Sequence, residues 1–559
     1  MDPGRMANIQ SQVSLLKREG EERAAQKLAE RLGSGYVDLS KVPASVEAIK
    51  LIEEQDAKDG KLAAIELKSR IVAVAMLNPE LPAAKKVVES LREKQYEVKI
   101  FIASLSGVEQ AWRLYKFVKP AVEVITGRIK IEEKRMKETA EHLKTFAAVR
   151  DEIGKTNFIK ISPLELIETV LAGAISIKAS DAHFEAEEKK VKIRFRIDGL
   201  LHDVFTELPL DNYEALLSRL KLIAGLKINI KDVAQDGRFS INVGNKEIEI
   251  RVSIIPSEFG ETLVMRVLDP EAANVGLAGL GIREDDLVIV NRSLSKPNGL
   301  ILNTGPTGSG KTTTLYSFLK NINNAETKII TLEDPIEYRL EGVEQTQADP
   351  AAGYDFVNGL RSVVRQDPDV ILVGEIRDVD TADIALQAAL TGHLVLSTLH
   401  TNDAIGAIPR LINLGVKPVT IGPALNLIIA QRLVRKLCPQ CKKPAQIAPD
   451  MASKISTFIS SLPARVDKSK FEKYEVYEPG GCDACNNFGY RGRVGIFEFF
   501  EAVPELEEII LKDASEGVIR KLAEKGGMVT MQQDGILKVL VGQTTFHEIE
   551  NTTGQIEWQ

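Results

Sequence analysis

The sequence predicts an α/β protein of several domains, and two observations support this prediction. The chain has 559 residues, whereas domains usually span about 100–200 residues, so several hydrophobic cores are expected. From about residue 271 onward, short and almost entirely apolar runs alternate with helical segments; the runs are GLILNT, KIITLE, VILVGE and HLVLSTLH. Buried strands of a parallel sheet have this composition, and functional residues gather at their carboxyl ends.

Composition and charge are those of an ordinary globular protein. Apolar residues make up 44% and charged residues 27% of the chain, and the formal net charge is −7. This balance weighs against a protein that coats nucleic acid or binds membranes by charge. The N-terminal MDPGRMANIQSQ lacks the apolar segment of a secretory signal, and polar residues interrupt every apolar window well before the ~20 positions of a membrane-spanning helix. We therefore expect a cytoplasmic protein with reduced cysteines.

Residues 1–118 are expected to form a small α/β domain. IVAVAML and YEVKIFIA have the composition of strands, and ELPAAKKVVESLREK between them has helical spacing. Residues 119–157 then become charged and helical, as in KIEEKRMKETAEHLK. We interpret this second segment as a linker with a solvated helix face.

Residues 158–270 are expected to form a second domain around a sheet with one solvated face. A capped helix in SPLELIETVLAG precedes alternating segments such as VKIRFRI, EIEIRVSII and ETLVMRVL. These strands carry a set of arginines: Arg194, Arg196, Arg238, Arg251 and Arg266. So many arginines fit either a solvated sheet surface or a wall that faces an anion, and the residues alone favour neither.

The strongest motif follows the run GLILNT. Residues Gly305 to Thr312 fit the pattern G-x-x-x-x-G-K-T between an expected strand and an expected helix. Glycines let the backbone N–H groups wrap phosphate oxygens, and the helix N-terminus adds a favourable dipole. In such a loop Lys311 reaches the β- and γ-phosphates and the Thr312 hydroxyl ligates Mg²⁺. The motif therefore predicts a nucleotide site rather than a purely structural glycine loop.

Hydrolysis of a nucleotide also needs carboxylates that hold Mg²⁺ and orient water. Two expected strand ends supply them, since KIITLE ends at Glu333 and VILVGE ends at Glu375. Asp334 and Glu337 crowd the first of these in the stretch TLEDPIEY. We expect the crowded carboxylates at the open mouth of the sheet, where positive charge offsets their repulsion. Spacing alone does not say which glutamate holds Mg²⁺ and which activates water.

Two histidines bracket the run HLVLSTLH. His400 stands at its carboxyl end, level with the acidic candidates, and is expected to sense the γ-phosphate. His393 stands at the other end and is the lesser candidate, because a single histidine is more often an ordinary core residue.

The four cysteines form two C-x-x-C pairs, Cys438 with Cys441 and Cys482 with Cys485. Two such pairs are typical of the two knuckles of a tetrahedral, structural zinc site. A redox pair or an iron–sulfur cluster are the alternatives. Two matched pairs fit the redox interpretation poorly, so we favour zinc.

Taken together, these motifs resemble one family. GPTGSGKTTTLY, TLEDPIEYRLEGVEQTQ, LRSVVRQDPDVILVGEIRD, TGHLVLSTLHTNDA, QRLVRKLC and CDACNNFGYRGRVGIFE are similar to the secretion ATPase superfamily, and within it to the motors of type IV pilus assembly and type II secretion. The resemblance runs from about Leu164 to the C-terminal region and is most specific between Gly305 and Arg435. The segment GYVDLSKVPASVEAIKLI resembles the first domain of the assembly motors.

The resemblance implies an architecture and a set of partners. Residues 271–559 would form a RecA-like P-loop core with a zinc-binding insertion at about 436–490, preceded by a PAS-like α/β domain and an N-terminal α/β adaptor domain. The protein would be a homo-hexamer that hydrolyses ATP to ADP and phosphate. It would act at the inner membrane through a platform protein and a cytoplasmic adaptor, as a peripheral component without stably bound nucleic acid.

The resemblance also implies residue roles. Glu333 would activate water, Glu375 would hold Mg²⁺ together with Thr312, and His400 would belong to a histidine box. Arg238 and Arg251 would reach the phosphates, with Arg196 and Arg266 as lesser candidates. The nucleotide-binding set comprises Gly305, Pro306, Thr307, Gly308, Ser309, Gly310, Lys311, Thr312 and Thr313.

Some features depart from the family pattern, and other functions stay open. INIKDVAQDGR is less basic than the corresponding family stretch, and a single ERLGSGY gives no ground for expecting a cyclic dinucleotide ligand. A type II secretion motor is the alternative to pilus assembly. A nucleic-acid translocase built on the same core is less favoured, and the complete motifs disfavour an inactive scaffold.

Overall fold

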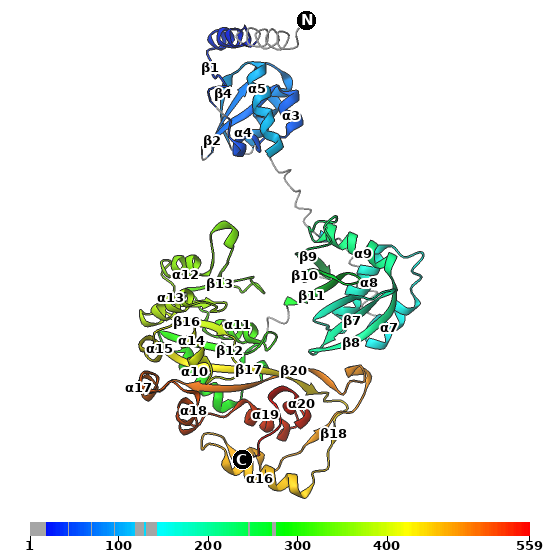
Figure 1. The fold of residues 1–559 in the computed structure, drawn as a ribbon, viewed down its shortest axis with the longest axis vertical. Helices are drawn as coiled ribbons and strands as arrows, with labels where there is room; N and C mark the ends of the chain where they lie inside the picture. Colours follow the sequence, from blue (N-terminus) through cyan, green and yellow to red (C-terminus); the bar gives the residue numbers. More distant parts are fainter. Residues whose placement is uncertain are drawn as a thin grey trace, which may run out of the picture. The chain divides into compact units, whose positions relative to one another are not determined.

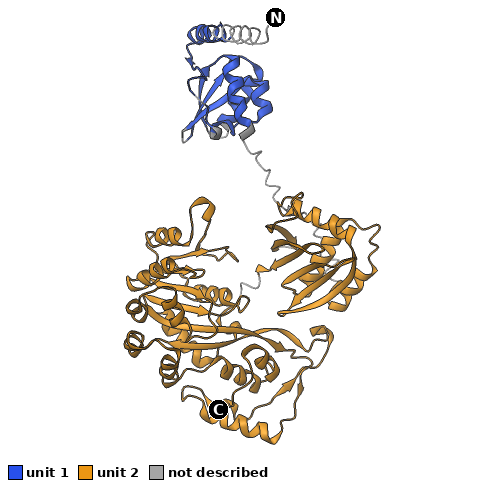
Figure 2. Ribbon diagram, in the orientation of Figure 1, with its two compact units in different colours: residues 1–126 blue, residues 127–559 orange. Residues whose placement is uncertain are grey.

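The computed structural model describes residues 18–558 except 19, 43, 69, 94–95, 118–127, 130–141, 244–245 and 271–274. The chain divides into two compact units, residues 1–126 and residues 127–559 (Figure 2). Most of the expected linker at 119–157 lies outside the described residues. Its last part is described and contains helix α7, Phe146–Lys155, which begins at the N-cap Thr145.

The first unit is built on a four-stranded sheet in the order β1-β4-β3-β2. β3 and β4 are parallel and are joined through α4, which is the expected strand–helix–strand arrangement, whereas β2 is antiparallel to β3. β3 reads IVAVAM and is buried along nearly its whole length. The elements of this unit are β1 Gly35–Tyr36, α2 Val46–Ile49, α3 Glu54–Asp59, β2 Leu62–Lys68, β3 Ile71–Met76, α4 Pro82–Glu93, β4 Glu97–Ile102, α5 Leu105–Trp112 and η1 Arg113–Phe117.

The second unit begins with a seven-stranded sheet, which we call the arginine sheet, in the order β5-β9-β10-β11-β6-β7-β8. Apart from the short β5, neighbouring strands are antiparallel. Along β7 every second residue is buried, as the sequence alternation predicts. The elements are β5 Arg128–Ile129, α8 Pro163–Ser176, β6 Asp181–Ala186, β7 Lys190–Ile197, β8 Leu200–Pro209, α9 Leu210–Ile223, β9 Gln235–Val243, β10 Lys246–Ser257 and β11 Gly260–Leu268. Helix α8 begins with a capping box between Ser162 and Glu165.

A second seven-stranded sheet, which we call the core sheet, follows in the order β14-β13-β15-β16-β12-β17-β20. Six strands are parallel and β20 is antiparallel to β17, so the sheet is mixed at this edge rather than parallel throughout. The elements up to β17 are η3 Leu277–Leu280, α10 Glu284–Leu294, β12 Gly299–Thr304, α11 Lys311–Ile322, β13 Ile329–Glu333, β14 Glu344–Gln347, η4 Pro350–Ala352, α12 Phe356–Val364, β15 Val370–Val373, α13 Val379–Leu390, β16 Leu394–Leu399, α14 Ala407–Asn413, α15 Pro418–Ala424 and β17 Leu425–Leu437 (Figure 1).

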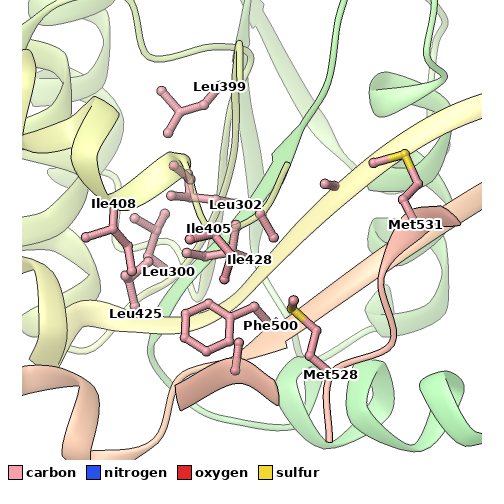
Figure 3. Packing of buried hydrophobic residues seen from close by; sticks show 14 of the residues in the cluster. Leu300, Leu302, Leu399, Ile405, Ile408, Leu425, Ile428, Phe500, Met528 and Met531 are labelled. Atoms are coloured by element: carbon pink, nitrogen blue, oxygen red, sulfur yellow. The ribbon is translucent and has the colours of Figure 1, made fainter. Parts of the chain in front are cut away.

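Both faces of the core sheet are buried along its central strands, which explains why successive residues of those strands are mostly apolar. Leu300 and Leu302 of β12 pack into one cluster, together with Ile428 of β17 and Phe500 of β20 (Figure 3). Ile301, between those two leucines, belongs to a separate cluster on α11. Successive residues of a strand point to opposite faces, so a strand covered on both faces needs apolar residues throughout.

The C-terminal part continues from β17 and returns through β20. The long segment between the two cysteine pairs contains α16, whose Ile455 and Phe458 are buried in the main core cluster. The remaining elements are β18 Lys443–Pro444, α16 Pro449–Ser461, η5 Lys468–Phe471, β19 Tyr477–Glu478, η6 Asp483–Cys485, β20 Tyr490–Glu501, α17 Pro504–Lys512, α18 Glu516–Lys525, α19 Met531–Leu540 and α20 Phe546–Thr553. In the described part of the chain, no helix has the length and apolarity needed to cross a membrane.

Candidate functional site

The glycine-rich loop lies between β12 and α11, at the carboxyl end of a strand in the interior of the core sheet. Gly305, Gly308 and Gly310 all have positive φ, between 81° and 149°. A Cβ atom on Gly305 would lie 2.6 Å from the Gln431 carbonyl oxygen and from Ser309 Oγ. The loop therefore requires glycine for its backbone conformation and for its close contact with β17.

Lys311 is the first residue of α11. Its Nζ donates hydrogen bonds to the carbonyl oxygens of Gly305, at 2.7 Å, and of Pro306, at 3.1 Å. Burial lowers the pKa of Lys311 to about 8; the negative charge of Glu375 opposes this shift and the positive charge of Arg432 adds to it. The ammonium group thus lies within the glycine loop, near both a carboxylate and a second cation.

Glu333 is the last residue of β13, and its side chain is buried, with the residue only 3% exposed. Tyr316 of α11 donates a hydrogen bond to one carboxylate oxygen; Thr331, at 2.6 Å, and Gln345, at 3.3 Å, donate to the other. Burial raises the pKa of Glu333, although these hydrogen bonds oppose the shift. From the sequence we expected this carboxylate to lie at the mouth of the parallel sheet. The structure instead buries it beneath the mouth, because hydroxyl and amide donors replace water there.

Glu375 follows β15, whose carboxyl end lies beside those of β13 and β16. Its carboxylate forms an ion pair with Arg377, and its Oε2 lies 3.6 Å from His400 Nε2. Burial lowers the pKa of His400, as does the charge of Lys311, while Glu375 opposes the shift. Glu375, His400 and Lys311 therefore interact with one another at the end of the core sheet where the parallel strands have their carboxyl ends.

His393 lies at the opposite end of the core sheet. It precedes β16, its carbonyl accepts a hydrogen bond from the N–H of Gly299 at the start of β12, and its Nδ1 lies 3.0 Å from the Ala388 carbonyl oxygen. The structure thus does not bring His393 together with His400.

Strand pairing lines up four arginines in one row across the arginine sheet. Arg251 lies opposite Arg238 on one side and Arg266 on the other, and Arg266 lies opposite Asp181, which in turn lies opposite Arg196. Asp181 forms ion pairs with Arg266, at 3.0 Å, and with Arg196, at 3.6 Å. The positive charge of the row is therefore compensated at its Asp181 end, while Arg238 is exposed at the other end.

Arg251 connects this row to the core. Its Nη1 lies 2.7 Å from a carboxylate oxygen of Glu337, and its Nη2 donates a hydrogen bond of 2.8 Å to the Ile336 carbonyl oxygen. Both acceptors belong to the loop that follows Glu333. The contact gives Glu337 a basic partner from the arginine sheet, which offsets the crowding of carboxylates in TLEDPIEY.

The four cysteines converge. Their Sγ atoms all lie within 4.8 Å of one another. The Sγ–Sγ distance is 3.8 Å for Cys438–Cys482 and 3.7 Å for both Cys441–Cys485 and Cys482–Cys485. Sulfur ligands at ~2.3 Å from a tetrahedral zinc ion lie about 3.8 Å apart. The N–H of Gly489 also donates a hydrogen bond of 3.3 Å to the Cys485 sulfur. The donor set and spacing are compatible with Zn²⁺.

The second cysteine pair also contacts the arginine-sheet domain. Phe488 stacks on the His202 ring with centroids 4.2 Å apart, and meets the Phe146 ring edge-on at 5.6 Å. The N–H of Phe146 donates a hydrogen bond of 2.8 Å to Asn486 Oδ1, and the N–H of Gly492 donates one of 2.7 Å to Asp198. We call this set of residues the knuckle contact.

Three residues near the glycine loop were missed in the sequence. Tyr316 bonds Glu333; Gln431 accepts hydrogen bonds from Asn303, at 3.0 Å, and Thr314, at 2.8 Å; and Arg432 lies beside Gly305. The stretch LNLIIAQRLV is an apolar run followed by polar residues, like the other core strands. The strand-end rule could therefore have found Gln431 and Arg432, whereas only the packing of α11 reveals Tyr316.

Comparison with known proteins agrees with this geometry. The family model described as "Type II/IV secretion system protein" matches residues 160–551. The "Type IV pilus assembly ATPase PilB" of Myxococcus xanthus is 38% identical over 528 residues, which is 94% of this chain and 90% of that protein. The "Type II secretion system protein E" of Dickeya dadantii is 45% identical over 392 residues, 70% of this chain and 75% of that protein.

Among solved structures, the ATPase DotB of Yersinia pseudotuberculosis has a TM-score of 0.52 at 20% identity and covers 71% of this chain and 95% of its own. At that identity the likeness concerns the fold alone. The family model covers well over half of the chain, and the M. xanthus relative aligns along nearly all of it. The chain therefore belongs to the type II/IV secretion system protein family, and it is an ATPase.

Proposed function

We propose that the protein is the hexameric motor ATPase of type IV pilus assembly, peripheral at the cytoplasmic face of the inner membrane. Its partners there would be an inner-membrane platform protein and a cytoplasmic adaptor. In this proposal residues 1–118 are the adaptor domain, 119–157 a linker, 158–270 the domain that clamps on nucleotide, and 271–559 the hydrolysing core with its zinc-binding insertion at about 436–490.

The observation that supports this proposal is the convergence of chemistry at one edge of the core sheet. The glycine loop, Lys311, Glu375 and His400 meet there, and Arg251 reaches the loop next to Glu333 from the arginine sheet. Phosphoryl transfer depends on positioning and on cations around the transferred group, and this edge supplies both.

Each residue has a proposed role in the reaction. The N–H groups of Gly305 and of residues 307–313 would bind the phosphates, and Lys311 would exchange its carbonyl partners for the β- and γ-phosphates. Glu333, whose pKa is raised by burial, would accept a proton from the attacking water. The water oxygen would form a bond to the γ-phosphorus while the bond between the γ-phosphorus and the β–γ bridging oxygen breaks. The products are ADP and phosphate. Arg238 and Arg251 would stabilise the charge on the phosphates.

Two metals belong to the proposal. Thr312 and Glu375 would hold Mg²⁺, which neutralises charge on the phosphate oxygens when bound. Cys438, Cys441, Cys482 and Cys485 would hold a structural Zn²⁺, whose filled coordination leaves no position for catalysis.

One relative supports pilus assembly over secretion by its coverage, while the assembly ATPases of Acinetobacter baylyi and Pseudomonas aeruginosa align over the same 70% of this chain as the secretion proteins. The M. xanthus assembly ATPase aligns with 94% of this chain, the first unit included, whereas the Dickeya secretion protein aligns with 70%. Type II secretion stays the alternative. Deleting the gene decides between them. Loss of an assembly motor leaves cells without pili, whereas loss of a secretion motor leaves exported enzymes in the periplasm.

Two variants test the hydrolytic site. Lys311→Ala should abolish ATP turnover, and Glu333→Gln should lower kcat by about 10²–10⁴-fold, the usual contribution of a general base. Glu344→Gln is a matched control, since Glu344 is exposed at the amino end of β14 and should not affect turnover. Turnover that survives in Lys311→Ala would overturn the site, and turnover that survives in Glu333→Gln would overturn the role of that carboxylate.

A nucleic-acid translocase predicts a different result in the same assay. DNA would then stimulate ATP turnover, with a steep dependence on salt concentration. We expect no such stimulation.

A further inference from the structure

Arg432 lies beside the glycine loop on β17. Thr304, the last residue of β12, pairs with Ala430, so Arg432 stands two residues beyond that pair, abreast of the first residues of the loop. A Cβ atom on Gly305 would lie only 3.2 Å from Arg432 Nη1. The guanidinium group therefore packs against the first glycine of the loop, on the strand next to β12.

The partners of Arg432 are neutral. Its Nη1 donates a hydrogen bond of 3.2 Å to the Gln431 carbonyl oxygen, and its Nη2 donates one of 3.1 Å to the Asn402 carbonyl oxygen, with Asn402 Oδ1 at 3.4 Å. The printed hydrogen bonds of Arg432 thus go only to backbone and amide oxygens, while Asp403 and Glu498 attract its charge from farther away; burial nevertheless lowers the pKa of Arg432. Half-buried guanidinium groups are usually paired directly with carboxylates, so among the described residues this one keeps room for an anionic partner.

Lys311 is similar in its hydrogen bonds, although Glu375 attracts its charge. Its hydrogen bonds also go to two carbonyl oxygens, and its pKa is depressed partly by the charge of Arg432. Two cations thus flank the same glycine loop, one from α11 and one from β17. Their mutual repulsion is relieved if an anion sits between them.

We propose that Arg432 binds the terminal phosphate of ATP within the subunit that holds the nucleotide. The proposal rests on the nucleotide site proposed above and adds a phosphate-binding cation to its core side. Arg432 would give up the carbonyl oxygens of Gln431 and Asn402 for phosphate oxygens, to which a guanidinium group makes stronger, charge-assisted hydrogen bonds. Asn402 lies two residues beyond His400, so the exchange also releases the loop that carries this histidine.

A phosphate-binding role and a structural role predict different affinities. If Arg432 binds the terminal phosphate, Arg432→Gln should weaken binding of a non-hydrolysable ATP analogue by about tenfold or more, as expected for a hydrogen bond to a charged group. Binding of ADP, which lacks that phosphate, should change by less than about threefold. If Arg432 only supports the loop at Asn402, both nucleotides should be affected equally.

The experiment measures both dissociation constants with fluorescent nucleotides on the full-length protein. Arg432→Lys keeps the charge and should retain part of the preference for the ATP analogue. Lys436→Gln removes an exposed charge further along β17 and is the matched control. The melting temperature without nucleotide shows whether each variant is folded, and Arg432→Lys serves as the test if Arg432→Gln is not.

The outcomes separate this inference from the proposed function. An unchanged ratio of the two affinities in Arg432→Gln, with turnover abolished in Lys311→Ala, overturns the role of Arg432 alone. Surviving turnover in Lys311→Ala overturns the nucleotide site and this inference together. Selective loss of affinity for the ATP analogue supports the assignment.

Discussion

Two of the contacts between the core and the arginine-sheet domain, which comprises the arginine sheet and helices α7, α8 and α9, differ in chemistry. At one, Arg251 contacts Glu337 and the Ile336 carbonyl oxygen, and at the other Phe146 and His202 pack on Phe488. The first contact is a partly exposed ion pair, which salt or phosphate can displace. The second combines aromatic rings with backbone hydrogen bonds and depends on the shape of a cysteine loop. In the proposed clamping on nucleotide, the first contact would open and close, and the second would serve as the pivot.

Removing metal from the cysteine cluster should break the knuckle contact most severely. Structural zinc in small domains contributes ~10 kcal/mol or more to folding, so the loop from Cys482 to Gly489 should lose its conformation. Hydrogen exchange should then speed up at the amides of Phe146 and Gly492, which donate to Asn486 and Asp198. Removal of zinc from the wild type by a chelator and the substitution Cys482→Ser should produce the same increase in hydrogen exchange. Protein that contains no stoichiometric zinc, or unchanged exchange after chelation, would contradict this expectation.

Phe488→Ala should weaken the knuckle contact without affecting the metal. Phe488 takes part in two ring contacts, and each is worth about 0.5–1.5 kcal/mol, so a loss of ~1–3 kcal/mol is expected in chemical unfolding. Zinc content should stay at the wild-type level. Phe488→Tyr keeps the ring and is the control. If Phe488→Ala unfolds like the wild type, the rings do not stabilise the pivot.

Glu337→Gln and Arg251→Gln remove the same ion pair and should cost little stability. Such pairs contribute about 0.2–1 kcal/mol, so the melting temperature should hardly change in either variant. Turnover should separate them, because only Arg251→Gln removes a proposed phosphate contact; arginines in that role accelerate phosphoryl transfer by about 10³–10⁵-fold. Equal turnover in the two variants would show that Arg251 acts only through Glu337.

The smallest expected effect is a pH dependence of the knuckle contact. Burial lowers the pKa of His202, the charge of Arg435 lowers it further, and Asp198 opposes the shift. The folded state thus favours the neutral His202 ring. The contribution of His202 to the stability of the contact is complete above its ordinary pKa of about 6.5 and is lost as the pH falls through the lower pKa of the folded state. The protection factor of the Phe146 amide, which is the ratio of its intrinsic to its observed exchange rate at each pH, should fall as the pH is lowered from 7 to 5.5. His202→Phe keeps a ring and should abolish the fall; a fall that persists would assign the titration to another group.

The sequence allowed the fold class to be predicted well, because four strands of the core sheet, β12, β13, β15 and β16, are recognisable as apolar runs, whereas the polar β14 is not. Leu300, Ile301 and Leu302 must all be apolar when both faces are covered, and the alternation in β7 marks a sheet with one wet face. The glycines of the phosphate-binding loop could also be recognised in the sequence, because the backbone angles of the loop exclude other residues. The antiparallel edge strand β20 was not predicted, because a strand's direction leaves no mark on its own composition.

The candidate site could be predicted in its strand-end positions but not in its environment. Glu333 was located by its place after an apolar run, yet its burial depends on Tyr316 and Gln345, which come from other elements. The row of arginines depends on pairing β11 with β6, in which Arg266 lies opposite Asp181 although the two residues are 85 positions apart in the chain. Such pairings are set by tertiary packing and not by local pattern.

The row of arginines distributes charge unevenly along the strand-to-strand axis of its sheet. Asp181 compensates Arg196 and Arg266 toward one end, whereas Arg238 is exposed at the other end and Arg251 pairs with Glu337 and Glu249. In the proposed clamping on nucleotide, a highly charged anion near the exposed end would exert a torque on the domain as well as a pull. The torque would turn the Arg238 edge toward the phosphates before any hydrogen bond forms.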